Sequence, residues 1–334
     1  MPTNYTTKRR RSLGRHCSIF ATLFVFFFRG WGARLRAQSH THFVTYDELS
    51  HGEVQVAQHC HRGATIVTAY YNIGQNSKHS EAKFRLWNRR FFGLRDSMVV
   101  FTDALTAKQI GDWRVRTFGC SILVISDLKH SELWRAYDWN SQYEKDPEKS
   151  IHSSELYVIW NQKSLWLSDV ATSNPFSSDH FFWADSGQFR DDDFLNKFVR
   201  KNGDVWLRTA DWFPSCQILF LSVESFTERE SQFDSSGRSI ILDSKLVRLG
   251  GGNFGGDTCA IMRWRDLFLE QLERYVVSGA FAGKDQPIYG TTCLQHRELC
   301  FLVDGRKVRD INDVWFAMQP VLHGVQRPLP RYVP

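Results

Sequence analysis

The feature that most constrains the fold is an alternation of short apolar runs with helix-like segments between residues 65 and 185. The runs are rich in β-branched and aromatic residues, as buried strands are, and they occupy residues 65–70, 98–101, 121–125 and 181–184. Segments with helical spacing or polar insertions separate them. Such alternation predicts an α/β fold with a mostly parallel sheet flanked by helices, because parallel neighbours need a long crossover connection.

The C-terminal half is less regular. An amphipathic helix is expected over 263–277, a glycine-rich loop over 250–256, and strands over 218–223, 239–242 and 300–303. We therefore predict a single large domain over residues 64–322. A polar, His-rich stem or linker over 37–63 precedes it, and a Pro-rich tail over 323–334 follows it.

The N-terminal segment, residues 1–36, has the pattern of a targeting signal. A basic cluster between Lys8 and Arg15 precedes the 12-residue apolar run Cys17–Phe28. As a helix this run spans about 18 Å, short of a bilayer core of about 30 Å. A signal peptide fits that length, a short type II signal-anchor requires extension past Arg29, and an Arg-rich transit peptide is a third reading. We favour entry into the secretory pathway, with the endoplasmic reticulum or Golgi lumen as destination. Any membrane contact is then made through this segment.

The net charge of +6 comes from that same segment, which holds eight Lys or Arg residues and no acid. The rest of the chain has 34 basic and 36 acidic residues. The predicted domain is therefore not basic, and its composition gives no support for nucleic-acid binding.

Six of the seven cysteines follow the N-terminal segment, and their spacing matches no zinc motif. In an oxidising lumen some of them are expected to pair, for example Cys293 with Cys300. The sequence leaves the connectivity open.

Polar residues follow three of the predicted strands: Asn72, Asp103 and Asp185. Ligands of open α/β sheets bind at the carboxyl ends of the strands, so we expect these residues to share a cleft and to contact a bound nucleotide. Asp185 follows the strongest apolar strand, and carboxylate oxygens are the ligands that Mg²⁺ and Mn²⁺ prefer. It is the candidate metal ligand; the alternative is that it only caps a turn.

Lys163 falls on the apolar stripe of a helix that begins near Ser154. An unpaired buried ammonium is costly, so this lysine meets a phosphate or a buried carboxylate, or it extends to solvent at the edge of the stripe. In the glycine-rich loop, Gly255 and Gly256 are candidates for close approach to a ligand such as a sugar ring, and the default alternative is a plain connector. Asp285 lies in a polar break between helices, as a candidate general base or a helix N-terminal acid.

Three blocks stand in order along the chain: Trp-Asn-Gln-Lys at 160–163, Asn-Pro-Phe at 174–176 and Phe-Trp-Ala-Asp-Ser-Gly at 182–187. With Phe-Thr-Asp at 101–103, the 250–256 loop and Gly-Lys-Asp-Gln at 283–286, they resemble the HtrL/YibB-like proteins over about residues 64–322.

That family's pattern is similar to GT-A-type glycosyltransferases, and the resemblance implies a GT-A-like fold, a nucleotide-sugar donor and Mn²⁺ or Mg²⁺. Asp185 corresponds to the metal-binding acid, but Gly187 replaces the second Asp of the usual motif, which bears on metal dependence. The segment 283–286 resembles an element that faces the acceptor, which places Asp285 and Gln286 there.

We therefore predict a glycosyltransferase that transfers a sugar to a glycan or glycoconjugate acceptor. The residues expected to bind the donor are Asn72, Asp103, Lys163, Gly255 and Gly256, and Lys163 would neutralise phosphate charge. The alternative is a non-catalytic glycan-binding protein on the same fold.

Overall fold

The structure, a computed structural model, describes residues 41–331 except 53, 55, 57, 61–62, 75–78, 118, 209–211 and 243–244. The predicted targeting segment lies outside the described residues. Within the described part of the chain, no helix is both long enough and apolar enough to cross a membrane.

The described residues form one nine-stranded sheet with the order β1-β4-β3-β2-β5-β7-β6-β8-β9. The strands are β1 (Thr41–Thr45), β2 (Ala64–Tyr70), β3 (Ser97–Thr102), β4 (Ser121–Ile125), β5 (His180–Ala184), β6 (Ile218–Ser222), β7 (Leu249–Asp257), β8 (Cys300–Asp304) and β9 (Pro330–Arg331).

Pairing is parallel from β1 through β4, β3 and β2 to β5, and again between β6 and β8. Strand β7 runs antiparallel between β5 and β6, and β9 is antiparallel to β8. The predicted α/β domain with a mixed, mostly parallel sheet flanked by helices is confirmed. The four predicted strands between residues 65 and 184 are neighbours within this sheet.

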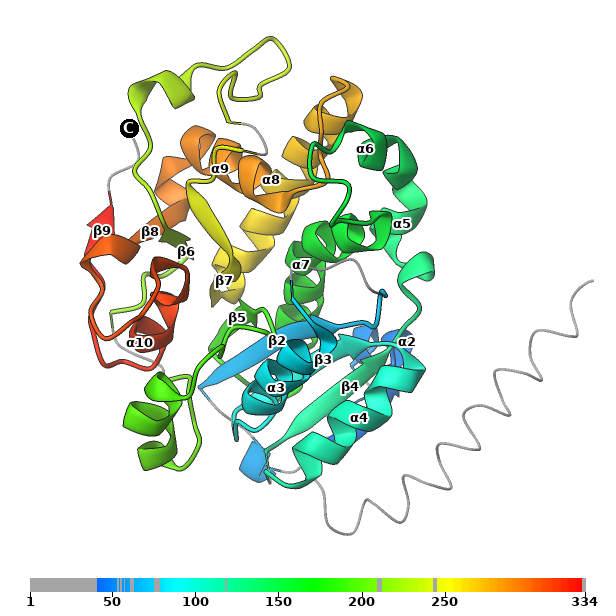
Figure 1. Cartoon of the computed structure of the whole chain (residues 1–334), viewed down its shortest axis with the longest axis vertical. Helices are drawn as coiled ribbons and strands as arrows, with labels where there is room; N and C mark the ends of the chain where they lie inside the picture. The colour runs from blue at the N-terminus through cyan, green and yellow to red at the C-terminus, as the bar shows by residue number, and fades with distance from the viewer. Residues whose placement is uncertain are drawn as a thin grey trace, which may run out of the picture. The chain divides into compact units, whose positions relative to one another are not determined.

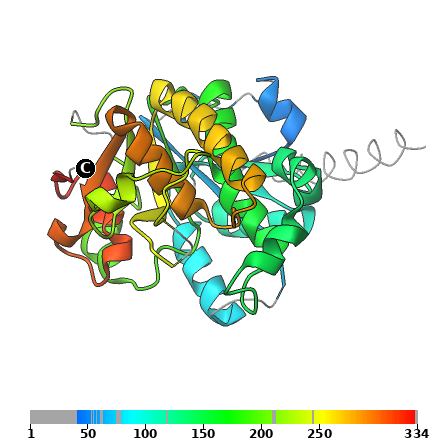
Figure 2. The same cartoon turned by 90° about the horizontal axis from the view of Figure 1, so that it is seen from above.

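Helices cover both faces of the sheet (Figures 1 and 2). They are α2 (Tyr46–Ser50), α3 (Glu81–Phe91), α4 (Ala104–Val115), α5 (Glu132–Ala136), α6 (Trp139–Lys145), α7 (Ser154–Ser173), α8 (Thr258–Val277), α9 (Asp285–Gln295) and α10 (Met318–Leu322). Seen from above, α3 lies on one side of the sheet and α8 on the other (Figure 2).

Two apolar layers follow from this arrangement, because successive strand residues point to opposite faces. One layer joins Val67 and Trp183 to the inner faces of α7, α8 and α9. The other joins Ile66 and Phe182 to α3, α4 and α10. Both faces of β5 are buried, which explains why its sequence is a continuous apolar run.

The folded domain extends further at both ends than its predicted limits of 64 and 322. Strand β1 lies within the segment 37–63 that we expected to be a linker, and it pairs along its whole length with β4. Strand β9 lies in the expected Pro-rich tail and pairs with β8. Both strands are short and lie at the ends of the sheet, so neither has the long apolar run that marks the central strands.

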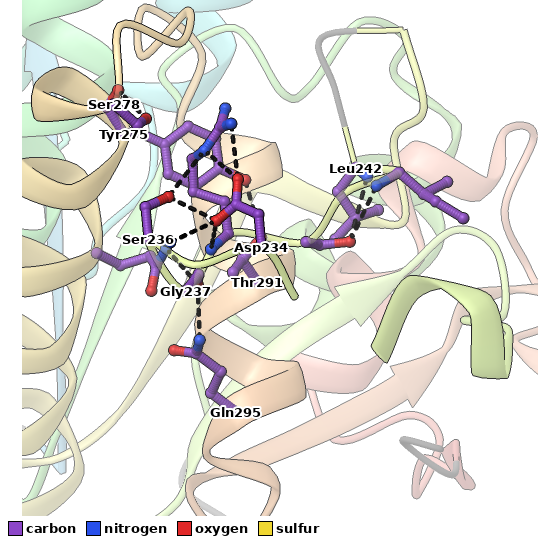
Figure 3. A network of polar contacts seen from close by, with 12 residues as sticks. Asp234, Ser236, Gly237, Leu242, Tyr275, Ser278, Thr291 and Gln295 are labelled. Carbon is purple, nitrogen blue, oxygen red and sulfur yellow. Dashed lines mark hydrogen bonds and ion pairs between the residues drawn. The ribbon is translucent and has the colours of Figure 1, made fainter. Parts of the chain in front are cut away.

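The expected strand over 239–242 is wrong. These residues belong to a loop with a single bridge between Phe233 and Ser239. Asp234 accepts hydrogen bonds from Ser236, the Arg238 side chain pairs with Asp234 at 2.7 Å, and Gln295 donates to the carbonyl of Gly237 (Figure 3). Within 239–242, the Ser239 hydroxyl accepts from the backbone N–H groups of Ile241 and Leu242 at 3.4 and 3.3 Å, so a side chain and not a neighbouring strand bonds these groups.

Three disulfides join cysteines in the described part of the chain: Cys60–Cys120, Cys216–Cys259 and Cys293–Cys300. The third is the pair that the sequence suggested. Disulfides of this kind persist in oxidising compartments, so they fit a lumenal or extracellular location.

Candidate functional site

Three residues predicted to share a cleft lie at the carboxyl ends of neighbouring strands, which we call the carboxyl edge of the sheet. Asn72, Asp103 and Asp185 each follow a strand, and β2, β3 and β5 are parallel neighbours, so their carboxyl ends face the same way. The backbone N–H of Asn72 lies 3.4 Å from Oδ2 of Asp103. The expectation of a common edge is therefore met.

The carboxylate of Asp103 makes its hydrogen bonds to the helix that follows it. It is the N-cap of α4, and its Oδ1 accepts from the backbone N–H groups of Leu105 and Thr106 at 2.9 Å each. Its Oδ2 accepts from the Thr106 hydroxyl at 2.7 Å. Capping satisfies the free N–H groups of the first helical turn, so Asp103 has a local structural role at this edge.

Asp185 has one anchored and one open oxygen. Its Oδ1 accepts from the indole N–H of Trp183 at 2.8 Å and lies 3.3 Å from Nζ of Lys163. No residue of the described part of the chain donates a hydrogen bond to Oδ2. The side chain is 46% exposed. It therefore reaches solvent, while Trp183 and Lys163 fix its orientation through Oδ1.

Lys163 is buried, with 3% of its side chain exposed. Its ammonium donates to the carbonyl oxygen of Gly251 at 3.0 Å and lies 3.3 Å from Asp185 and 3.2 Å from Asp285. Burial alone would lower the pKa of Lys163, but the two carboxylates raise it above its ordinary value. Of the readings that the sequence left open, pairing with a buried carboxylate is the one found.

Asp285 is the first residue of α9, and only 6% of its side chain is exposed. Burial raises the pKa of Asp285, against the opposing effect of Lys163. Tyr289 lies one turn later on the same helix, beside this carboxylate, and burial raises its pKa well above the ordinary value. Gln286 is half-buried at the same helix terminus. The sequence therefore located two acids, Asp185 and Asp285, that the fold brings to one lysine.

The glycine-rich segment is strand β7 and not the loop we expected. Its register with β6 shifts between Phe220 and Leu221, so residues 251–253 bulge at the carboxyl edge. A Cβ atom on Gly251 would lie 2.8 Å from Oδ2 of Asp285, and one on Gly252 would lie 3.3 Å from Oδ2 of Asp185. Glycine at these two positions leaves room for both carboxylates.

Gly255 and Gly256, the predicted donor-binding glycines, lie away from this site. They pair with Phe182 and Phe181, because an antiparallel strand reaches the carboxyl edge with its first residues and then runs away from it. A Cβ on Gly255 would lie 2.1 Å from the carbonyl oxygen of Phe181. These glycines allow close packing between strands.

Two buried amides at the site escaped the sequence analysis. Asn253 pairs with Ala184 in the sheet, and its Nδ2 donates to Oε1 of Gln188. Oδ1 of Asn253 and Nε2 of Gln188 have no hydrogen-bond partner among the described residues. No local pattern in the sequence marks this pair, since its two members come together only through the sheet.

The fit of a metal ion to this edge depends on Asp185. In the described part of the chain, groups of three or more potential ligands occur only around Cys60 with Cys120 and around Cys216 with Cys259, and disulfides occupy these cysteines. Among the described residues at this site, Asp185 has an exposed carboxylate oxygen that accepts no hydrogen bond, whereas Asp285 is buried. One carboxylate suits Mg²⁺ or Mn²⁺ when substrate phosphates and water complete the coordination.

Comparison with known proteins defines the family. A family model described as "Bacterial protein of unknown function (HtrL_YibB)" matches residues 116–318, more than half of the chain. The chain belongs to the HtrL/YibB family. The HtrL/YibB match includes Lys163, Asp185 and Asp285, whereas Asn72 and Asp103 lie before it.

No curated protein matches the chain. Among solved structures, the apo form of mouse xyloside xylosyltransferase 1 is similar with a TM-score of 0.40 and 10% sequence identity. The similarity covers 76% of this chain and 93% of that chain.

Proposed function

We propose that this protein transfers a sugar from a nucleotide-sugar donor to a glycan or glycoconjugate acceptor. One observation carries the proposal. Asp185 presents an open carboxylate oxygen at the carboxyl edge of the sheet, while Trp183 and Lys163 fix its other oxygen from behind. A carboxylate oxygen fixed at the carboxyl end of a strand can hold a divalent cation, and that cation can in turn bind the phosphates of a ligand.

Asp185 would hold Mg²⁺ or Mn²⁺ against the donor diphosphate. The bound ion would neutralise phosphate charge and stabilise the nucleoside diphosphate as a leaving group. Lys163 already has three oxygen partners, so in this proposal it holds Asp185 and Asp285 in place. The sequence-based role of Lys163 as a direct phosphate ligand is less well supported by this geometry.

Asp285 is the candidate general base. In the transfer step an acceptor hydroxyl oxygen bonds to the anomeric carbon of the sugar, and the bond from that carbon to the phosphate oxygen breaks. Asp285 would accept the hydroxyl proton, and the raised pKa of this carboxyl improves it as a base at neutral pH. Gln286, at the same helix terminus, would contact the acceptor.

Neutral polar groups at the edge support a sugar ligand. Oδ1 of Asn253 and Nε2 of Gln188 are buried beside this site without partners, and a sugar hydroxyl that reached them would be both donor and acceptor. Asn72 lies farther along the edge beside Asp103, where the nucleoside would extend. We place the donor along this line, from Asn72 to Asp185.

The lumen of the endoplasmic reticulum or Golgi is the proposed location. The N-terminal basic cluster followed by the apolar run Cys17–Phe28 supports it, as do the three disulfides. A fluorescent protein fused to the C-terminus of the full chain should enter the secretory pathway, and diffuse cytosolic or mitochondrial fluorescence would contradict this location.

A second function, glycan binding without catalysis, is favoured by a different observation. The ammonium of Lys163 lies between the two acids, and Gly187 supplies no second carboxylate. On this reading the ion pairs only stabilise the fold, and the edge binds glycan through amides and aromatic rings.

One experiment separates the two functions. The full-length chain is titrated by calorimetry with UDP-, GDP- and CMP-sugars, with and without Mn²⁺, and with free oligosaccharides. Binding of a nucleotide sugar that requires Mn²⁺ supports the transferase. Binding of oligosaccharides alone, with no nucleotide-sugar binding under either condition, supports the glycan-binding protein and rejects the transferase.

A further inference from the structure

Arg190 lies five residues after Asp185 and is held by aromatic rings. Its guanidinium carbon is 4.9 Å from the ring centroid of Trp87 on α3 and 5.2 Å from that of Phe316 in the turn Val314–Phe316. The side chain is exposed. A guanidinium stacked on aromatic rings keeps its N–H groups free in its own plane, where they can bind two oxygens of one anion.

The charge of Arg190 is not neutralised by its neighbours. Three acids follow it directly, but each has other partners: Asp192 pairs with Arg90 and Arg200, and Asp191 and Asp193 accept from Asn312. Within the described part of the chain, no carboxylate pairs with the Arg190 guanidinium. An arginine beside three acids that pairs with none of them is available for an anionic ligand.

Hydrogen bonds hold the backbone of Arg190 on both sides of its peptide unit. Nη1 of Arg90 donates to the carbonyl oxygen of Arg190 at 2.6 Å, and the N–H of Arg190 donates to that of Gln188 at 3.1 Å. A Cβ on Gly187 would lie 3.7 Å from the Trp87 ring. Trp87 thus lies beside both Arg190 and Gly187, which belongs to the turn that follows Asp185.

The balance of charges at the site indicates which kind of ligand Arg190 can bind. The positive charge of Lys163 is matched by Asp185 and Asp285, so these three groups supply no surplus cation for a phosphorylated ligand. We propose that Arg190 binds a phosphate group of the substrate, an inference that rests on the proposed transferase function. Two sources carry this chemistry, namely the donor diphosphate and a phosphorylated acceptor sugar.

The test compares Arg190→Gln and Arg190→Lys with wild type in the full-length chain. Arg116→Gln is the matched control, because Arg116 is an exposed arginine at the other end of α4, away from the carboxyl edge. Calorimetry measures the affinity for pyrophosphate, for UDP, GDP and CMP, and for glucose 6-phosphate, each with and without Mn²⁺. Thermal unfolding of each variant checks that the fold is kept.

We expect Arg190→Gln to weaken binding of its phosphate ligand by about tenfold or more, as for the loss of a hydrogen bond to a charged group. Arg190→Lys should recover part of that loss, since it keeps the charge without the planar fork. Loss confined to pyrophosphate and nucleotides identifies the donor as the source, and loss confined to glucose 6-phosphate identifies the acceptor. If Arg190→Gln binds every phosphate probe as Arg116→Gln does, or if wild type binds none, the proposal is wrong.

The outcome for Arg190 is distinguishable from that for the transferase. Arg190-dependent binding of pyrophosphate or glucose 6-phosphate without metal supports the phosphate site even when no Mn²⁺-dependent nucleotide binding occurs. Conversely, Mn²⁺-dependent nucleotide binding that is unaffected in Arg190→Gln keeps the transferase and removes Arg190 from it.

Discussion

Nζ of Lys163 lies 3.2 Å from Oδ2 of Asp285, and both side chains are buried. Helices α7 and α9 supply the two residues, so this ion pair ties together two helices on the same face of the sheet. Each of these buried charges neutralises the other. Removing either side chain would leave its partner as an unpaired charge in the protein interior, which is strongly unfavourable.

The first prediction concerns the stability that depends on this pair. Lys163→Met should lower the free energy of unfolding by about 3–5 kcal/mol, because it leaves buried Asp285 unpaired. Denaturant unfolding measures the change. In the double variant Lys163→Met/Asp285→Leu, much of the loss should return, since no buried charge remains. Additive losses in the double variant would show that the two side chains are not energetically coupled.

Asp185 provides the second prediction. Asp185→Ala should abolish Mn²⁺-dependent binding of nucleoside diphosphate, because it removes the open carboxylate oxygen at the sheet edge. The fold should persist, since the side chain is 46% exposed. Calorimetric titration measures the affinity, with Asp112→Ala, an exposed acid on α4, as the control. Unchanged nucleotide affinity in Asp185→Ala would mean that this acid only fixes a turn.

Asp285→Asn should separate catalysis from binding. Transfer should fall by about 10²–10⁴-fold if a general base is lost, while donor affinity stays near that of wild type. A transfer assay run beside the titration measures both, at a temperature where the variant is folded. Wild-type turnover in Asp285→Asn would remove the base assignment and leave Asp285 as a partner of Lys163 only.

A pair of glycines tests the close approach of β7 to the acids. Gly251→Ala should lower stability by about 1–3 kcal/mol, because its Cβ would lie 2.8 Å from Oδ2 of buried Asp285. Gly187→Ala is the matched control, as its Cβ would meet only the Trp87 ring at an ordinary 3.7 Å. Equal thermal midpoints for the two variants would show that the bulge adjusts to a side chain.

The fifth prediction is that the stability of the fold depends on pH through Asp96, which directly precedes β3 at the amino ends of the strands. Asp96 accepts hydrogen bonds from the backbone N–H groups of Trp206 and Leu207 at 2.8 and 2.7 Å. Burial raises the pKa of Asp96 from 3.8 to about 6, although these hydrogen bonds act in the other direction. Between those pH values the native state holds a proton that the unfolded state releases. The free energy of unfolding should therefore fall as pH rises through this window.

Asp96→Asn should remove this component, which is on the order of 2–3 kcal/mol across the window. Denaturant unfolding of wild type and variant at pH 4, 5, 6 and 7 measures it. Asp169, whose pKa burial also raises to about 6, titrates in both proteins and cancels in the difference. Parallel pH profiles for the two proteins would contradict the prediction.

The central half of the fold was predictable because its signals are local. Each strand between residues 65 and 184 is a buried apolar run, and segments with helical spacing separate some of these runs. Strand β7 was mistaken for a loop because its glycines carry no apolar pattern, and their strand conformation depends on β5 and β6 on either side. Strands β1 and β9 were missed because pairing with an existing sheet, and not local sequence, defines them.

At the site, the two acids and the lysine were identified individually, but their contact was not. Lys163 stood out as a charge on an apolar stripe, and Asp185 as an acid after a strand. Nothing in the sequence shows that Asp285 of α9 reaches the same ammonium, since that depends on how α9 packs beside β7. Asn253, Gln188 and the aromatic partners of Arg190 were missed for the same reason.

Strand β1 also determines where the domain can be divided. Thr41–Thr45 covers β4 along its full length, and β4 consists of the apolar run Ser121–Ile125. A chain beginning at residue 64 would leave the backbone N–H and C=O groups of β4 unpaired along an open, apolar edge. Such an edge is a template on which a second molecule can add a strand, so self-association and aggregation follow from its exposure. Removal of the five residues of β1 is therefore expected to promote self-association of the domain through β4.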